Sequence, residues 1–204
     1  MGVTARLSRI GVFGGSFDPP HNAHVALVQA AVRQLQLDEL RVFPTGHAWH
    51  KPRPLSAAGH RLAMARLAFA DLPLVVVDER EMQRAGPTYT IDTLRQLRAE
   101  QAGAQLFLIM GEDQAAALPS WHRWPEILQI AIISIAGRAP STGTHGLFDP
   151  SKLPQGQFEA LQLPPMSVSA TNIRALVAAG QGVAHLVPDG VARYIEQHHL
   201  YRTA

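Results

Sequence analysis

Apolar residues in this chain fall into short runs that alternate with longer stretches of helical spacing. The short runs are rich in β-preferring residues and predict strands at 10–13, 40–43, 74–77, 106–110 and 130–135. The periodic stretches predict helices at 22–36, 56–70, 90–100, 170–179 and 188–198, with a further short segment at 121–128. Nearly continuous apolar strands alternating with helices predict an α/β fold, a doubly wound, mostly parallel sheet with helices on both faces.

Length and composition predict a single domain over residues 1–204. Hydrophobic residues make up 47% of the 204 positions and charged residues 17%, which is enough apolar material for one buried core. The 15 prolines and 16 glycines are scattered between the periodic segments, where they serve as turns. Residues 137–165 are the least regular stretch and have the composition of a mobile surface excursion.

Composition also narrows the location and the partners. The chain has no cysteine, which excludes disulfides, thiolate metal sites and a cysteine nucleophile, and which suits a reducing compartment. No apolar run reaches membrane-spanning length, and the first one is too brief for a signal peptide. The formal charge of +2 gives no argument for a nucleic-acid partner. We therefore expect a cytoplasmic protein without membrane or nucleic-acid contacts, whose oligomeric state the sequence leaves open.

The loop after the first predicted strand has the chemistry of a phosphate site. Gly14 and Gly15 lack a Cβ, so a ligand can approach the backbone, and the following helix start offers unpaired N–H groups. His21 and His24 are three residues apart and project from the first helical turn into one pocket. Two histidines at a helix start are also common as plain surface residues. A metal site is the weaker reading, because no third ligand lies nearby, and we expect none.

A second candidate lies near the other end of the chain. Ser167, Ser169 and Thr171 lead into a predicted helix that carries Arg174, so hydroxyls, helix N–H groups and a guanidinium converge. This mixture suits the β- and γ-phosphates of ATP. Hydroxyl residues in front of a helix are often only caps, and the ligand reading gains its weight from the first loop.

Both segments resemble signatures of the nucleotidylyltransferase superfamily. Its marker is a histidine or threonine, any residue, glycine and histidine, and this chain has His21-Asn22-Ala23-His24, with alanine for the usual glycine. The preceding string GGSFDP looks like the version found in nicotinate-nucleotide adenylyltransferases, and SVSATNIR is similar to the second superfamily signature. The resemblance implies a Rossmann-like nucleotidylyltransferase fold, in which the helical part from about 166 completes the ATP site. The implied ATP-binding residues are Gly14, Gly15, Ser16, Phe17, His21, His24, Gly111, Asp113, Ser169, Thr171 and Arg174.

Segments between these signatures resemble the acceptor site of the same family. The loop at 44–52 keeps basic positions, the segment at 86–90 looks like the loop that meets the pyridine carboxylate, and a tryptophan matches the one that stacks on the pyridine ring. The implied acceptor-binding residues are His50, Lys51, Tyr89, Thr90, Trp121, His122 and Arg138. Without the resemblance, Trp121 would be a packing residue, Asp113 a helix cap, and His50-Lys51 a solvated turn.

The resemblance implies transfer of AMP from ATP to nicotinate mononucleotide, which yields deamido-NAD and pyrophosphate in NAD biosynthesis. His24 would stabilise the transition state with help from His21, while Lys51 and Arg174 supply fixed positive charge. Mg²⁺ would accompany ATP, held by phosphate oxygens and water.

Several alternatives remain open from the sequence. The acceptor can be nicotinamide mononucleotide, or a pantetheine or alcohol phosphate as in related transferases. A non-catalytic ATP-binding regulator is a third reading, which Ala23 favours. A nucleic-acid-binding module is weaker still, because the basic residues are dispersed.

Overall fold

The computed structural model describes residues 6–46, 55–138, 149–153 and 155–202. The strands in these residues form one sheet in the order β3-β2-β1-β4-β5-β6. The strands are β1 Arg9–Gly15, β2 Glu39–Pro44, β3 Val75–Val77, β4 Gln105–Gly111, β5 Ala131–Arg138 and β6 Phe158–Leu163. β4 runs parallel to β1 and to β5, and β5 runs parallel to β6. The predicted α/β class is confirmed, because this order is that of a Rossmann-like sheet that reverses between β1 and β4.

The predicted helices are confirmed to within a few residues at their ends. The helices are α1 Asn22–Gln34, α2 Ala58–Phe69, α3 Arg80–Gln83, α4 Thr90–Glu100, α5 Glu112–Ala117, α6 Trp124–Ile130, α7 Ala170–Ala178 and α8 Asp189–Gln197. Short 3-10 turns lie at Leu118–Ser120 and Pro150–Lys152. None of the helices in the described residues combines the length and the apolar character needed to cross a membrane.

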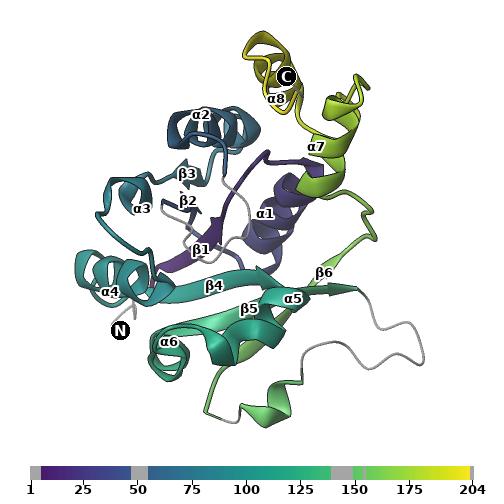
Figure 1. The fold of residues 1–204 in the computed structure, drawn as a ribbon. Helices are drawn as coiled ribbons and strands as arrows, with labels where there is room; N and C mark the ends of the chain where they lie inside the picture. The colour runs from purple at the N-terminus through teal and green to yellow at the C-terminus, as the bar shows by residue number, and fades with distance from the viewer. Residues whose placement is uncertain (1–5, 47–54, 139–148, 154, 203–204) are drawn as a thin grey trace. The chain divides into compact units, whose positions relative to one another are not determined.

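The contacts divide the chain into two compact units, each made of three segments. The first unit consists of Met1–Gly14, Ala30–Arg41 and Tyr89–Pro164. In it, β4, β5 and β6 lie side by side, and α5 and α6 pack against the sheet (Figure 1). The central strands of this unit are apolar and buried along most of their length, as expected for a sheet covered on both faces. The expectation of a single domain stays a prediction.

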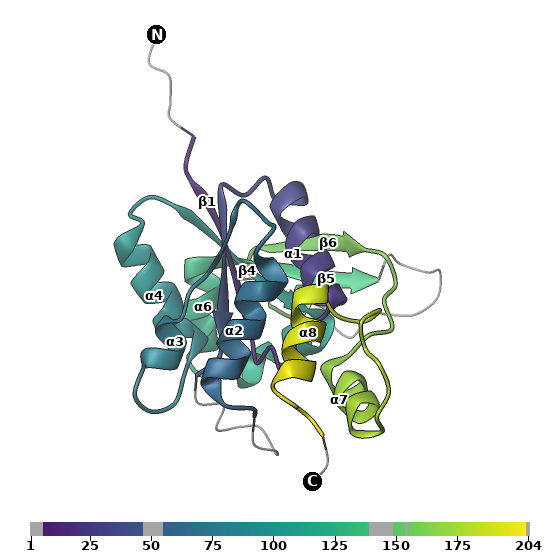
Figure 2. The same ribbon diagram turned by 90° about the horizontal axis from the view of Figure 1, so that it is seen from above.

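The second unit consists of Gly15–Gln29, Val42–Thr88 and Pro165–Ala204. In it, α8 packs along α2, as Figures 1 and 2 both show. The core of this unit is built from large apolar side chains with almost no exposed surface: Phe17, Phe43, Met64, Phe69, Ile173, Val191 and Ile195. The unit contains the glycine loop (residues 14–17) from Gly15 onward, the start of α1, and α7, which are the segments that carry most of the predicted ATP-binding residues.

The expectation that residues 137–165 form an irregular surface excursion is wrong for the last part of this range. Phe158–Leu163 forms β6, which pairs with β5 so that Ile133 lies opposite Phe158 and Ile135 opposite Ala160. The strand was missed because only Leu161 is fully buried, so the strand lacks the apolar run that marks the central strands. Residues 139–148 lie outside the described part of the chain.

Candidate functional site

The glycine loop continues β1 and is fixed by its own side chains. The Gly15 carbonyl accepts a hydrogen bond of 2.9 Å from the Thr45 amide. A Cβ on Gly15 would lie 2.9 Å from the Phe17 ring, whereas one on Gly14 would meet no described atom within 4 Å. Gly15 therefore makes room for a neighbouring side chain, and Gly14 is the position that leaves space beside the backbone.

The side chain of Phe17 packs against the backbone of this loop. Its backbone has φ 47°, in the left-handed region that a bulky residue rarely adopts, and its side chain is 2% exposed. The ring lies edge-on to Phe69 and to His24, with centroids 5.9 and 5.2 Å away. The ring of Phe17 is thus a core group that supports His24. A contact of its backbone with ATP stays a prediction.

His21 and His24 lie face to face at the start of α1. Their ring centroids are 3.7 Å apart with 23° between the planes, so the two imidazoles share one place as the spacing predicts. The Nδ1 atom of His24 accepts a hydrogen bond of 3.1 Å from the His21 amide. In a neutral imidazole the remaining proton then resides on Nε2, which makes that atom of His24 a donor.

Burial keeps both imidazoles neutral at physiological pH. Burial lowers the pKa of His21 from 6.5 to about 4. Burial, followed by the charge of His21, lowers the pKa of His24 well below 6.5. The Nδ1 atom of His21 is buried and has no hydrogen-bond partner among the described residues. A buried polar atom of this kind can bond a polar group of a ligand.

The structure brings Arg174 to the same loop. Its Nη1 atom donates to the Asp18 carbonyl at 2.8 Å, and its Nη2 atom donates to Thr171 Oγ1 at 3.1 Å. Ser169 is the N-cap of α7, since its hydroxyl accepts from the Asn172 amide at 3.2 Å, so one of the hydroxyl residues before this helix is a cap. A guanidinium from α7 therefore lies at the loop that leads, three residues later, to His21.

Arg61 is a residue of this region that sequence reasoning missed. It is 2% exposed, and its guanidinium donates to four backbone carbonyls, those of Ser16, Thr45, Gly46 and Ser56, at 2.7–3.2 Å. It thereby joins the glycine loop to the loop after β2. A signal existed in the sequence, because Arg61 shares the buried face of α2 with Met64, Ala65 and Ala68, at the spacing of an apolar stripe.

The predicted acceptor residues that are described belong to the first unit. The Tyr89 and His122 rings lie 4.3 Å apart between centroids, tilted by 31°. Trp121 follows the 3-10 turn and is partly exposed, and Thr90 is the first residue of α4. The rings of Tyr89, at the start of α4, and of Trp121 and His122, just before α6, are of a kind that can stack on a flat aromatic ligand.

The structure describes the other predicted site residues only in part. Gly111 is the N-cap of α5, and Asp113 lies exposed in its first turn. His50 and Lys51 lie outside the described residues. The backbone of Arg138 ends β5, and its side chain lies outside the described part. The roles of all these residues stay predictions.

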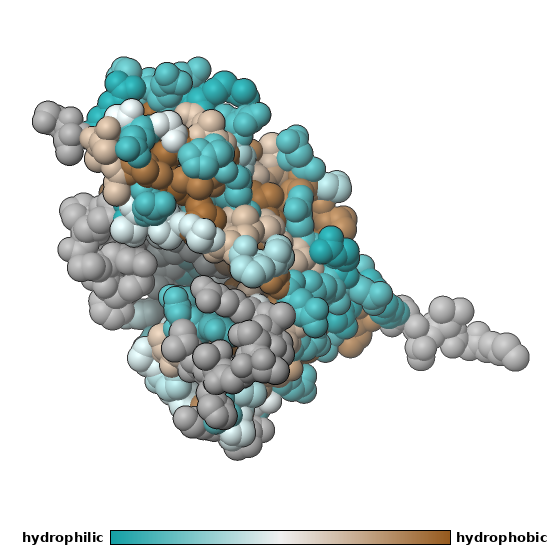
Figure 3. Space-filling view, turned by 90° about the vertical axis from the view of Figure 1, so that its right-hand side faces the viewer, coloured by the Kyte–Doolittle hydropathy of each residue, from teal (hydrophilic) through white to brown (hydrophobic). Residues whose placement is uncertain are grey.

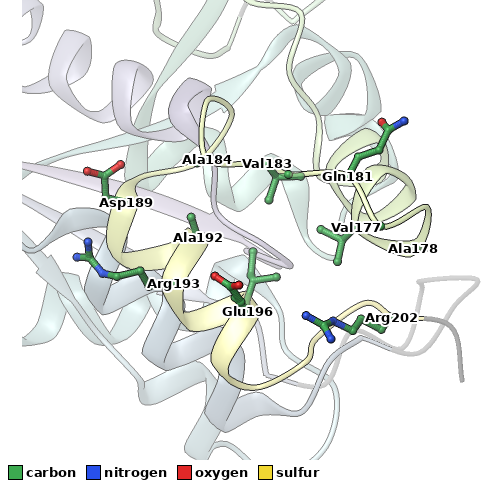
Figure 4. A pocket seen from close by; sticks show the side chains of 13 residues that line it. Val177, Ala178, Gln181, Val183, Ala184, Asp189, Ala192, Arg193, Glu196 and Arg202 are labelled. Carbon is green, nitrogen blue, oxygen red and sulfur yellow. The ribbon is translucent and has the colours of Figure 1, made fainter.

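A separate hollow of about 800 Å³ lies between α7 and α8. Its wall combines apolar side chains with charged ones, and Figure 4 shows Arg193, Glu196 and Arg202 along it. In the space-filling view, apolar surface surrounded by polar residues is visible in the upper part of the molecule, where these helices lie (Figure 3). None of the described residues predicted to bind a substrate lines this hollow. The candidate site is therefore the segment of residues 18–24, which we call the histidine loop.

Comparison with known proteins identifies the family and the fold of this chain. Residues 12–176 match the cytidylyltransferase-like family. A chain of Plasmodium falciparum nicotinic acid mononucleotide adenylyltransferase complexed with APC superposes with a TM-score of 0.78 at 18% identity, covering 95% of this chain and 97% of that one. The same enzyme complexed with NaAD gives a TM-score of 0.75 at 19% identity, with the same coverage. At these identities the likeness shows the fold, and fold and family match together define a nucleotidyltransferase.

Curated relatives narrow the assignment further. A protein of Albidiferax ferrireducens with the name "Probable nicotinate-nucleotide adenylyltransferase" is 62% identical over 198 residues, covering 97% of this chain and 100% of that protein. A protein of the same name from Pseudomonas aeruginosa is 43% identical over 208 residues, with coverage of 95% and 97%. The chain belongs to the family of nicotinate-nucleotide adenylyltransferases.

Proposed function

We propose that this chain transfers the AMP portion of ATP to nicotinate mononucleotide, releasing pyrophosphate and forming deamido-NAD, a step of NAD biosynthesis. The observation that carries the proposal is the arrangement at the start of α1. His24 presents a fixed Nε2–H donor, His21 stacks on it, and the Arg174 guanidinium lies at the same loop. The names of the relatives support the choice of acceptor.

The reaction needs no nucleophile from the protein. An oxygen of the acceptor's 5′-phosphate bonds to the α-phosphorus of ATP, and the bond from that phosphorus to the bridging oxygen breaks. The leaving pyrophosphate takes the electron pair. Catalysis then consists of alignment and stabilisation of the charge on the phosphate oxygens.

The candidate site residues that the structure describes have the following roles in this scheme. The Nε2–H of His24 donates to a phosphate oxygen whose charge grows in the transition state, and His21 assists. Arg174 supplies fixed charge toward the β- and γ-phosphates. Tyr89, Trp121 and His122 provide rings against which a pyridine can stack. Roles for His50, Lys51, Arg138, Gly111 and Asp113 follow from the family resemblance.

We further propose that Mg²⁺ accompanies ATP. The groups described at the histidine loop are mainly N–H donors, which fit phosphate oxygens, so the ion would be held by the triphosphate and water. Its chemistry would be to neutralise charge on the phosphates. We also propose a cytoplasmic location, which suits a chain without cysteine.

The test is pyrophosphate release by the purified protein with ATP, Mg²⁺ and each mononucleotide supplied separately. We expect release with nicotinate mononucleotide and a product with the mass of deamido-NAD. Faster release with nicotinamide mononucleotide would replace the proposed acceptor. No release with either compound would contradict adenylyl transfer to pyridine mononucleotides.

A further inference from the structure

Asp18 connects the histidine loop to three other segments of the second unit. It is 1% exposed. Its Oδ1 atom accepts from the Tyr201 hydroxyl at 2.7 Å, and its Oδ2 atom accepts from the Ser56 amide at 3.2 Å. Its backbone carbonyl accepts from Arg174 Nη1 at 2.8 Å. One residue therefore links the segment after α8, the segment before α2, and α7.

Tyr201 is held in an unusual position for this contact. Its backbone has φ 64°, in the left-handed region that is uncommon for a bulky residue. Burial and the neighbouring Asp18 carboxylate raise the pKa of the Tyr201 phenol, so the hydroxyl remains a donor at all physiological pH values. Its oxygen also lies 3.9 Å from the sulfur of the fully buried Met64. The hydroxyl is thus directed inward, toward the loop.

We propose that Tyr201 is a positioning residue for the ATP phosphates. By holding the Asp18 carboxylate, it fixes the orientation of the Asp18 backbone, and the carbonyl of that residue anchors one end of the Arg174 guanidinium. Thr171 Oγ1 anchors the other end. Tyr201 then acts on ATP through Asp18 and Arg174 without touching the nucleotide. The inference rests on the proposed role of Arg174, and it adds a residue that neither sequence signature contains.

A double-mutant cycle tests this link, since contacts in one chain of hydrogen bonds are not additive. The probe is the dissociation constant of ATP with Mg²⁺, measured by calorimetry without acceptor. Tyr201→Phe keeps the ring and removes the donor, and we expect the constant to rise about tenfold, as for one charge-assisted hydrogen bond. In an Arg174→Met background, the same change should alter the constant less than about twofold.

Tyr194→Phe is the matched control. The Tyr194 hydroxyl lies on α8 and contacts His60 Nδ1 at 3.0 Å, whereas the described hydrogen bonds of Asp18 and Arg174 go to other residues. We expect this variant to leave the affinity for ATP unchanged in both backgrounds. Asp18→Asn provides a second route to the same link, and its effect should likewise disappear in the Arg174→Met background.

Three outcomes would overturn the inference: no effect of Tyr201→Phe on ATP affinity, an equal effect in both backgrounds, or an equal effect of Tyr194→Phe. An equal effect in both backgrounds would mean that Tyr201 only anchors the segment after α8. The wild-type protein separates this test from the proposed function. If it binds ATP but releases no pyrophosphate with either mononucleotide, the proposed reaction is wrong while the cycle still decides the role of Tyr201.

Discussion

The Nδ1 atom of His24 accepts a hydrogen bond from the backbone amide of His21, and the rings of the two residues stack on each other. The amide holds the His24 ring in one orientation and sets its tautomer, while burial keeps the ring uncharged. A neutral imidazole with a fixed Nε2–H is a preorganised donor for a phosphate oxygen. The first prediction separates these two nitrogen atoms.

His24→Ala removes both the Nδ1 and the Nε2 atom. It should lower kcat by a factor of about 10² to 10³, the usual loss when one transition-state donor is removed. His24→Gln places an amide NH₂ near the position of Nε2, so we expect it to retain more activity than His24→Asn. Asparagine can replace only the acceptor for the His21 amide. The check is steady-state pyrophosphate release, with near-UV circular dichroism to verify folding. Equal activity of the Gln and Asn variants would contradict the assignment of the proton.

The two lowered pKa values predict a dependence of stability on pH. The unfolded chain binds protons on these histidines near pH 6.5, and the folded protein only at lower pH, at about 4 for His21. The stability contributed by the neutral imidazoles is therefore present above pH 6.5 and is lost as the pH falls from 6.5 toward 4. We expect a loss of about 1 kcal/mol per pH unit for each imidazole, measured by urea unfolding between pH 7 and 5.

A His21→Asn/His24→Asn double variant is the control for this slope. Without the two imidazoles, the free energy of unfolding should change much less over the same interval. An unchanged slope would assign the pH dependence to other groups and would refute the lowered pKa values.

Substitution by alanine should affect stability at one of two glycines near the site and not at the other. A Cβ on Gly46 would overlap the Glu81 carbonyl, so Gly46→Ala should lower stability by about 1 to 3 kcal/mol. A Cβ on Gly14 would meet no described atom, so Gly14→Ala should leave the melting temperature near that of the wild type. If phosphate lies beside this backbone, Gly14→Ala should raise KM for ATP about tenfold. An unchanged KM would move the nucleotide away from Gly14.

Arg61 should matter for stability more than any exposed arginine on the same helix. Arg61→Met leaves four backbone carbonyls without their donor, and we expect a loss of roughly 3 to 5 kcal/mol, measured by denaturant unfolding. The matched control is Arg66→Met, because the Arg66 side chain is 58% exposed and its ion pair in the described structure is with Glu79. Its loss should cost less than about 1 kcal/mol. Similar losses for both variants would contradict this reasoning.

The aromatic residues of the first unit should act on the acceptor alone. Trp121→Ala should raise KM for nicotinate mononucleotide about tenfold and leave KM for ATP unchanged, because it removes the ring on which the pyridine stacks. Trp121→Phe keeps a flat ring and should retain most of the affinity. A parallel rise of both KM values in Trp121→Ala would indicate a packing role instead.

The sequence predicted those features that depend on local patterns. The central strands are continuous apolar runs, and the cap at Ser169 follows from a hydroxyl in front of a helix. β6 was missed because an edge strand needs little apolar surface. Tyr201 was missed for another reason: its partner Asp18 lies 183 positions earlier in the chain, and no local spacing reveals such a contact. Arg61, in contrast, was visible as a cation within an apolar stripe.

The path of the chain through the two units limits how this protein can be altered. The chain passes from one unit to the other after Gly14, Gln29, Arg41, Thr88 and Pro164, so no single cut yields both units whole. The second unit, which carries most of the predicted ATP-binding residues, is therefore not a continuous fragment that could be fused to a foreign acceptor module. A change of acceptor would have to come from substitutions at the predicted acceptor-binding residues, several of which lie in the segment that starts at Tyr89, made in a chain that stays intact.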